Sequence, residues 1–172
     1  LIDKWIRTNS KKKYDTNGNI AKSGKVNKLV LKKYSNKYRA SDSRQTSYDI
    51  SDFDISFAKG LSLKDGAATL TLNTANYFIT NFKINKKLTN TPKEKKILCG
   101  GGRKNKFLVD IIKSYNKDVK LIDDYGIDGD FVESQAFAYL AIRSYLNLPI
   151  SFPKTTGVKK PCTGGVIVKF KK

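Results

Sequence analysis

The sequence predicts a layered α/β or α+β domain. Two short β-prone runs, 96–99 and 119–122, lie on either side of a segment with helical periodicity, and further amphipathic segments occur before and after them. Strands and helices in this order bury their apolar faces against one another in layers. With 172 residues, of which 39% are hydrophobic, the chain is long enough for one well-packed domain, and no change in composition indicates a second. A single domain over residues 1–172 is therefore expected.

Two helices are predicted in the first part of the chain. Leu1–Thr8 carries apolar residues at the i, i+1, i+4, i+5 spacing of one buried helical face. A polar loop with the turn signal Asn17-Gly18 comes next, and we expect Asn19 to cap a helix that continues to about Tyr34. The chain begins within the first of these helices and contains no methionine, so we expect a fragment or a processed piece of a longer protein.

The middle of the chain is predicted to hold one long helix. Residues 35–51 are rich in polar residues without periodicity and indicate a surface loop, whereas 52–57 fit either a strand or a helical turn. Ser62 with Asp65 three positions later resembles a capping box, which predicts a helix that ends near Lys83. The side chains predicted to face inward from this helix are Ala67, Leu70, Thr74, Phe78 and Phe82.

The run Gly100-Gly101-Gly102 is the strongest candidate for a ligand site. It follows a β-prone run, and it leads at once into a predicted helix whose apolar face is Phe107, Leu108, Ile111, Ile112 and Tyr115. Glycines allow a ligand to lie directly against main-chain N–H groups, and a helix start favours phosphate. The pattern is neither the dinucleotide fingerprint, which needs a third spaced glycine, nor a P-loop. A tight strand-to-helix turn without a ligand is the alternative.

The last part of the chain is predicted to contain a buried helix and a final strand. The acidic run 123–130 lacks the residue order of a calcium loop, which excludes that kind of site. Asp130 is instead expected to cap a helix over 131–146, where Glu133 either supports the helix start or faces a ligand. Apolar residues on most sides predict that this helix is central and well buried, and 166–170 indicates the strand.

The formal net charge of +19 is the most prominent feature of the composition. Its first interpretation is binding to nucleic acid or to an anionic membrane. The basic residues are predominantly lysine and are spread from end to end, whereas specific readers of nucleic acid favour arginine. An A+T-rich coding sequence would produce the same excess of Lys, Asn and Ile. We therefore expect no specific nucleic-acid partner and only weak, salt-sensitive binding to DNA.

Composition also bears on the compartment. No apolar run is long enough to span a bilayer, and no signal-peptide pattern is present, so we expect no membrane partner. The two isolated cysteines, Cys99 and Cys162, do not make a disulfide framework, and without histidine there is no zinc constellation. A reducing cytoplasm fits best.

Several sequence blocks carry a family resemblance. The matching segments are Leu98–Asn105, Gly126–Ala141, Leu148–Pro149, Thr155–Gly157 and Thr163–Gly165, with Leu1–Trp5 and Asp65–Thr71 further upstream. On these segments the chain resembles anhydro-N-acetylmuramic acid kinases, in their carboxyl-terminal lobe. The block Gly126–Ala141 is the most specific, and the resemblance is weak only between Ser10 and Asp52.

The resemblance implies a fold and an activity. The fold would be that of the sugar kinase, Hsp70 and actin superfamily, with two ribonuclease-H-like lobes and ATP in the cleft between them. This chain would be the second, nucleotide-binding lobe, and the absent amino-terminal lobe would be its partner. The family opens the ring of 1,6-anhydro-N-acetylmuramic acid by hydrolysis. It transfers the γ-phosphate of ATP, with Mg²⁺, to give N-acetylmuramic acid 6-phosphate in cell-wall recycling.

The resemblance also implies a nucleotide site. Its residues would be Gly100, Gly101, Gly102, Arg103, Asn105 and Glu133, of which the glycines would hold the adenosine. The family's catalytic aspartate would lie upstream of Leu1, so the chain by itself is expected to be inactive, and a homodimer is left open. The alternatives are an actin-like or Hsp70-like ATPase lobe that uses no sugar, which the block Gly126–Ala141 disfavours, and a basic nucleic-acid-binding module.

Overall fold

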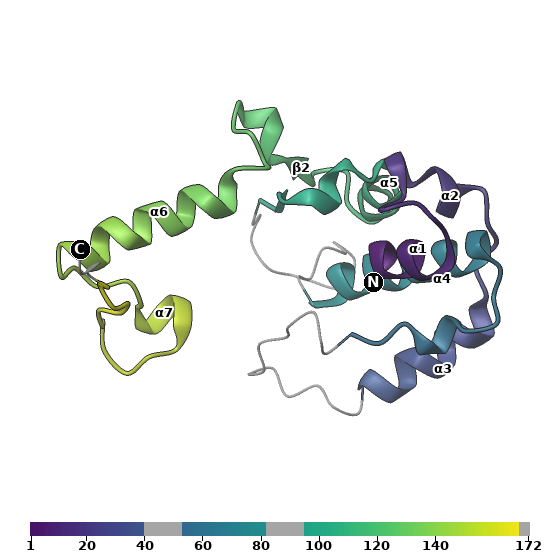
Figure 1. The fold of residues 1–172 in the computed structure, drawn as a ribbon, viewed down its shortest axis with the longest axis horizontal. Coiled ribbons are helices and arrows are strands. Elements are labelled where there is room, and N and C mark those ends of the chain that lie inside the picture. The colour runs from purple at the N-terminus through teal and green to yellow at the C-terminus, as the bar shows by residue number, and fades with distance from the viewer. Residues whose placement is uncertain (40–52, 82–94, 169–172) are drawn as a thin grey trace. The chain divides into compact units, whose positions relative to one another are not determined.

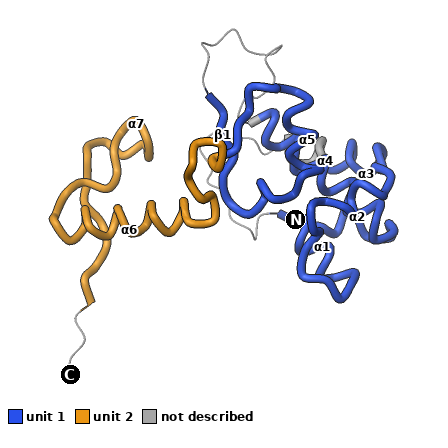
Figure 2. Tube along the Cα trace, turned by 90° about the horizontal axis from the view of Figure 1, so that it is seen from above, with its two compact units in different colours: residues 1–121 blue, residues 122–172 orange. Residues whose placement is uncertain are grey.

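The computed structural model describes residues 1–39, 53–81 and 95–168. The chain divides into two compact units, Leu1–Leu121 and Ile122–Lys172, which are coloured separately in Figure 2 and described one at a time. The expected single domain stays a prediction. The described residues form many helices and one small parallel sheet, which is an α/β arrangement. Among these helices, none has the length and apolar character that a membrane crossing would require.

Unit 1 is built around one long helix, α4, which spans Leu63–Asn81. The shorter helices α1, α2 and α5 pack on α4 (Figure 1). The bounds of the shorter helices are α1 Ile2–Asn9, α2 Asn19–Lys22, α3 Lys28–Arg39 and α5 Lys106–Tyr115. The 3₁₀ turns of the unit are η1 Thr16–Gly18, η3 Ser56–Ala58 and η5 Gly101–Lys104.

The start of α4 is capped as predicted and is tied to α1. The backbone N–H of Asp65 donates to Ser62 Oγ at 3.1 Å, so the Ser62 hydroxyl satisfies one of the free donors of the first turn. Trp5 of α1 donates from Nε1 to the Leu63 carbonyl at 3.0 Å. Gly66 leaves room for the indole, because a Cβ at this position would overlap the ring. The predicted first helix is confirmed as α1.

The core of unit 1 lies along α4. Of the residues predicted to face inward, Ala67 and Leu70 are fully buried, Thr74 and Phe78 are half-buried, and Phe82 lies outside the described residues. Helix α4 also contributes Ala75 and Ile79, and the segments around it supply the rest of the core: Ile2, Trp5, Ile6, Ala21, Ala58, Leu108, Ile112 and Val119. Burial of these side chains is the main stabilising contribution to the unit.

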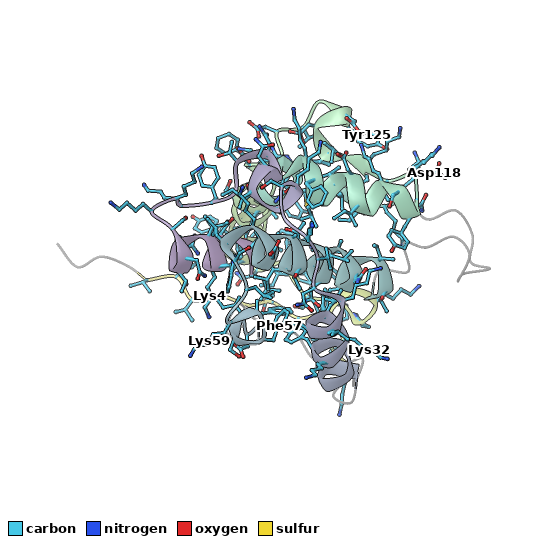
Figure 3. All side chains as sticks on the ribbon, turned by 90° about the vertical axis from the view of Figure 1, so that its right-hand side faces the viewer. Lys4, Lys32, Phe57, Lys59, Asp118 and Tyr125 are labelled. Atoms are coloured by element: carbon cyan, nitrogen blue, oxygen red, sulfur yellow. The ribbon has the colours of Figure 1, made fainter. Side chains whose placement is uncertain are left out.

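The 3₁₀ turn η3 adds an aromatic contact to this core. Phe57 stacks on Tyr34 of α3 with ring centroids 3.8 Å apart. Figure 3 shows Phe57 close to α3 and α4, whereas the exposed Lys32 and Lys59 lie at the outside. Of the segment 52–57, for which either a strand or a helical turn was expected, Ser56 and Phe57 lie in the turn η3, 53–55 lie in neither structure, and 52 lies outside the described residues.

The prediction of one continuous helix over 19–34 is wrong. A break at 23–27 separates α2 from α3, because this segment is held by α4. A Cβ at Gly24 would overlap the backbone of Lys64. The N–H of Lys25 donates to Asp65 Oδ1 at 2.7 Å, and the N–H of Asn27 donates to Thr69 Oγ1 at 2.9 Å. Bonds to another helix replace the i→i−4 bonds of a continuous one.

The ends of these two helices also differ from expectation. Gly18, not Asn19, is the N-cap residue of α2. The buried carboxylate of Asp15 does the capping, because it accepts the N–H groups of Ile20 at 2.8 Å and Ala21 at 2.9 Å. Helix α3 continues to Arg39 and so occupies the first part of the predicted loop, whose remainder lies outside the described residues.

Two short parallel strands frame α5. The strands are β1, Ile97–Leu98, and β2, Lys120–Leu121, and Ile97 pairs with Lys120 and Leu98 with Leu121. Both strands were predicted, and both are shorter than the β-prone runs. The unit formed by β1, α5 and β2 is a strand–helix–strand crossover, as parallel pairing requires.

Unit 2 contains η6 Ile122–Tyr125, α6 Val132–Tyr145 and α7 Pro153–Thr156. The predicted Asp130 cap is wrong: Phe131 is the N-cap residue of α6, and the backbone N–H of Asp130 donates to Asp128 Oδ1 at 2.9 Å in a turn that precedes the helix. The described part of the predicted final strand, 166–168, is not in a strand, and 169–170 lies outside the described residues.

The prediction that α6 is well buried is also contradicted. None of its residues is buried, and Phe137, Tyr139 and Ile142 are each about 60% exposed. Residues after the helix contact it through bonds such as Arg143 Nε to the Pro149 carbonyl at 2.7 Å and Ser144 Oγ to the Gly164 carbonyl. Apolar residues on most sides of a helix need neighbours on most sides, and the described residues of this unit supply too few.

Candidate functional site

The three glycines form a tight turn between β1 and α5. Gly100 has φ 76° and ψ 177°, a conformation that only glycine adopts readily. The N–H of Arg103 then donates to the Gly100 carbonyl at 3.2 Å, and the N–H of Asn105 donates to the Gly102 carbonyl at 3.1 Å. These bonds wind Gly101–Lys104 into η5, and α5 begins directly after Asn105. The predicted strand, glycine turn and helix are confirmed.

The outer side of this turn is open. Residues 99–102 are all exposed, and a Cβ built on Gly100 or Gly101 would meet no atom within 4 Å. A Cβ on Gly102 would meet only Leu108 Cδ2, at 3.9 Å. The N–H groups of Gly101 and Gly102 precede the first bonded donor of the turn, so they are not used within it. An anionic or polar ligand could therefore approach these N–H groups directly.

Arg103 lies beneath the turn. Its side chain is buried, with 8% of its surface exposed, and Nη1 donates to the Gly100 carbonyl at 3.1 Å. A buried guanidinium is costly unless it is paired, so this contact belongs to the structure of the turn. The sequence pattern placed Arg103 in the ligand site without indicating its burial.

Asn105 caps α5. Its Oδ1 accepts the N–H of Leu108 at 3.0 Å, which satisfies a free donor of the first helical turn. The side chain is also enclosed by η1, because a Cβ at Gly18 would overlap Asn105 Oδ1. Gly18 itself has φ 73°. The sequence analysis missed this support from Gly18, and the signal available was only the turn dipeptide that contains it.

The apolar face of α5 holds this arrangement on the core. Leu108 and Ile112 are buried, Phe107 and Ile111 pack against the core, and Tyr115 is 44% exposed. Four of the five predicted positions thus face inward, and Tyr115, at the end of the helix, does not. The glycine turn is fixed to a rigid element by these contacts.

Comparison with known proteins identifies the family. A family model described as anhydro-N-acetylmuramic acid kinase matches residues 1–170. The chain belongs to the anhydro-N-acetylmuramic acid kinase family. The similarity thus includes the segment between Ser10 and Asp52, where the sequence resemblance was weak.

Curated relatives with the name anhydro-N-acetylmuramic acid kinase agree with this family. The relative from Pelagibacter ubique is 47% identical over 176 residues, which cover 98% of this chain and 46% of the relative. The relative from Zymomonas mobilis is 39% identical and that from Agrobacterium fabrum 35% identical; the matches cover 97% and 98% of this chain and 45% of each relative. The chain therefore spans somewhat less than half the length of these anhydro-N-acetylmuramic acid kinases.

The six residues expected in the site fall into two groups. Gly100, Gly101, Gly102, Arg103 and Asn105 form one continuous segment of unit 1, whereas Glu133 lies in unit 2, exposed in the first turn of α6. The presence of Glu133 in the same site stays a prediction. A negative charge in the first turn interacts favourably with the helix dipole, whether or not Glu133 contacts a ligand.

The use of Mg²⁺, which the sequence resemblance implies, stays a prediction. The described residues contain no group of three His, Cys, Asp or Glu that could hold a metal ion. Magnesium in kinases is bound through one or two carboxylates together with the phosphates of the substrate, so a dedicated protein cage is not required. We assign Mg²⁺ to no residue of this chain.

Proposed function

We propose that this chain is the nucleotide-binding lobe of an ATP-dependent anhydro-N-acetylmuramic acid kinase with a ribonuclease-H-like fold. The whole enzyme would open the anhydro ring by hydrolysis and phosphorylate the sugar to N-acetylmuramic acid 6-phosphate, in the cytoplasm and with Mg²⁺ carried on ATP. The observation that carries the proposal is the open glycine turn at the start of α5, in a chain that belongs to a kinase family.

In this proposal the chain contributes backbone donors. The N–H groups of Gly101 and Gly102, with the positive end of α5 behind them, would bind the nucleotide where the missing Cβ atoms leave room. Rigid donors of this kind lose little entropy when the ligand arrives, which favours binding and orientation of ATP. We assign the base that activates water to no residue of this chain and expect it upstream of Leu1.

The competing functions make different predictions. An actin-like or Hsp70-like ATPase would consume ATP without the sugar. A nucleic-acid-binding module would rest on the net charge of +19 and would lose its ligand as salt rises. The family match favours the kinase over both.

The test uses the full-length protein that contains this chain. ADP release from Mg-ATP is measured with and without 1,6-anhydro-N-acetylmuramic acid, for the unmodified protein and for Gly101→Val. The kinase proposal expects sugar-dependent release that Gly101→Val abolishes with little change in melting temperature, because the new side chain points into open space. Lys106→Met, an exposed change in the first turn of α5, is the control and should keep the activity.

One result would contradict the kinase activity, and another would contradict the nucleotide site at the glycine turn. ADP release that does not depend on the sugar would indicate an ATPase. Full activity of Gly101→Val would show that the nucleotide does not approach the glycine turn, even if the protein is a kinase.

A further inference from the structure

We propose that Arg103 is a positioning residue, which fixes the orientation of the Gly100–Gly101 peptide and so directs the Gly101 N–H toward the nucleotide. The inference deepens the proposed function and rests on it for the identity of the ligand. The alternative is that the Arg103 guanidinium contacts a phosphate group directly, as its motif position alone would indicate.

Arg103 donates two hydrogen bonds to the Gly100 carbonyl oxygen. The Gly100 oxygen accepts the Arg103 backbone N–H at 3.2 Å and Arg103 Nη1 at 3.1 Å. A carbonyl oxygen has two lone pairs, and here Arg103 provides a donor for each. The side chain therefore reinforces the bond that closes the turn, and the contact from the charged group is the stronger type.

The direction of the Gly101 N–H follows from peptide geometry. The described residues contain no cis peptide bond, so the N–H of Gly101 points away from the Gly100 carbonyl in the same trans unit. Because Arg103 holds this carbonyl on its own, buried side, the Gly101 N–H is directed to the opposite side of the unit. That peptide joins two residues whose Cβ positions are open.

Without the Arg103 side chain, the Gly100–Gly101 peptide would be more flexible. Glycine at both positions gives this peptide wide freedom of φ and ψ, so a flip that exchanges the C=O and the N–H is sterically permitted. A flipped peptide would present an oxygen to an anionic ligand and repel it. The hydrogen bond from the side chain of Arg103, a residue that is 8% exposed, removes that freedom without having to reach the ligand.

The experiment compares Arg103→Met with Lys106→Met in the full-length protein. Both changes remove one positive charge near the turn, but Lys106 is exposed. The first readout is hydrogen exchange of the peptide that covers residues 99–105 in the absence of any nucleotide. The second is the dissociation constant for ATP, ADP and AMP. Arg103→Lys, which can still donate to the carbonyl, is measured in the same way.

We expect Arg103→Met to speed exchange in 99–105 and to weaken nucleotide binding roughly tenfold, for the loss of one charge-assisted hydrogen bond. Arg103→Lys should lie between Arg103→Met and the unmodified protein, and Lys106→Met should match the unmodified protein. Weakened nucleotide binding together with unchanged exchange in 99–105 would overturn the positioning role in favour of direct phosphate contact.

The two proposals fail in different ways. If the unmodified protein binds none of the three nucleotides, the kinase proposal fails, while hydrogen exchange still decides whether Arg103 orders the turn. If the unmodified protein binds them and Arg103→Met changes neither readout, the kinase proposal stands and the role of Arg103 is refuted. Should Arg103→Met fail to fold, Arg103→Lys decides by the same two readouts.

Discussion

The carboxylate of Asp65 accepts the backbone N–H of Lys25, 40 positions earlier in the chain, at 2.7 Å. This bond joins the first turn of α4 to the break between α2 and α3. Together with the Ser62 side chain it lowers the pKa of Asp65 below its ordinary value of 3.8, with the Lys25 N–H as the larger cause. The bond therefore makes the stability of unit 1 depend on pH.

We expect Asp65→Asn to lower the melting temperature at neutral pH. The folded pKa is lowered, so the contribution of the charged carboxylate is present above pH 3.8 and is lost as the pH falls through the folded pKa. Melting curves over this range should show the difference between wild type and Asp65→Asn shrinking in acid. Asp110→Asn, which removes an exposed carboxylate of α5, is the control. A difference that is constant with pH would refute the assignment.

Two glycines with positive φ provide a test of the open turn. Gly100 has φ 76° and Gly60 has φ 89°, and a Cβ at either would meet no atom within 4 Å. Each change to Ala should cost about 1–3 kcal/mol through backbone strain. Only Gly100→Ala should also reduce ATP affinity measured by calorimetry. Equal affinities of the two variants would show that the turn at Gly100 has no part in nucleotide binding.

Thr69 and Thr71 of α4 have side chains of the same type and burial, each 0% exposed, but different partners. Thr69 Oγ1 accepts the Asn27 N–H at 2.9 Å and donates to the Asp65 carbonyl at 2.7 Å. Thr71 Oγ1 has no hydrogen-bond partner among the residues that the structure describes. Thr69→Val should destabilise by about 1–3 kcal/mol, whereas Thr71→Val should be neutral or stabilising by about 1 kcal/mol. Urea unfolding measures both, and a similar loss for the two would be inconsistent with these contacts.

Glu133→Gln separates the two roles expected for this residue. If Glu133 only favours the dipole of α6, its replacement should cost at most about 1 kcal/mol of stability and leave sugar-dependent ADP release unchanged. If it faces the nucleotide, activity should fall with stability unchanged. Thermal unfolding and the kinase assay on the same preparation give the answer.

Local signals in the sequence predicted the parts of the fold that local contacts determine. The Ser62 cap and the apolar face of α5 were predicted because a hydroxyl three residues from an N–H, and a repeat near 3.6, fix these features within a few residues. The glycine turn was predicted for the same reason.

The errors in the predicted fold arose where contacts between segments distant in the sequence determine the local structure. Residues 23–27 contain the turn dipeptide Ser23-Gly24 and Asn27, whose Oδ1 accepts the Val30 N–H at 3.0 Å, and the sequence analysis overlooked both signals. The Lys64 backbone and the Asp65 and Thr69 side chains then hold the break in place. The apolar pattern of α6 likewise indicates that this helix packs against other segments, but it does not indicate which segments they are. In the site, the open positions at Gly100 and Gly101 followed from the sequence, whereas the burial of Arg103 did not.

The pairing of β1 with β2 has a consequence for any shortened form of this protein. The strand that leads into the glycines is hydrogen-bonded to Lys120 and Leu121, which follow α5 in the chain. A fragment that stopped at the end of α5 would keep the three glycines of the turn and the Asn105 cap, yet it would leave β1 without the strand that it pairs with. The smallest piece that preserves the shape of the turn therefore extends through Leu121, and cloning boundaries for binding studies should be chosen beyond it.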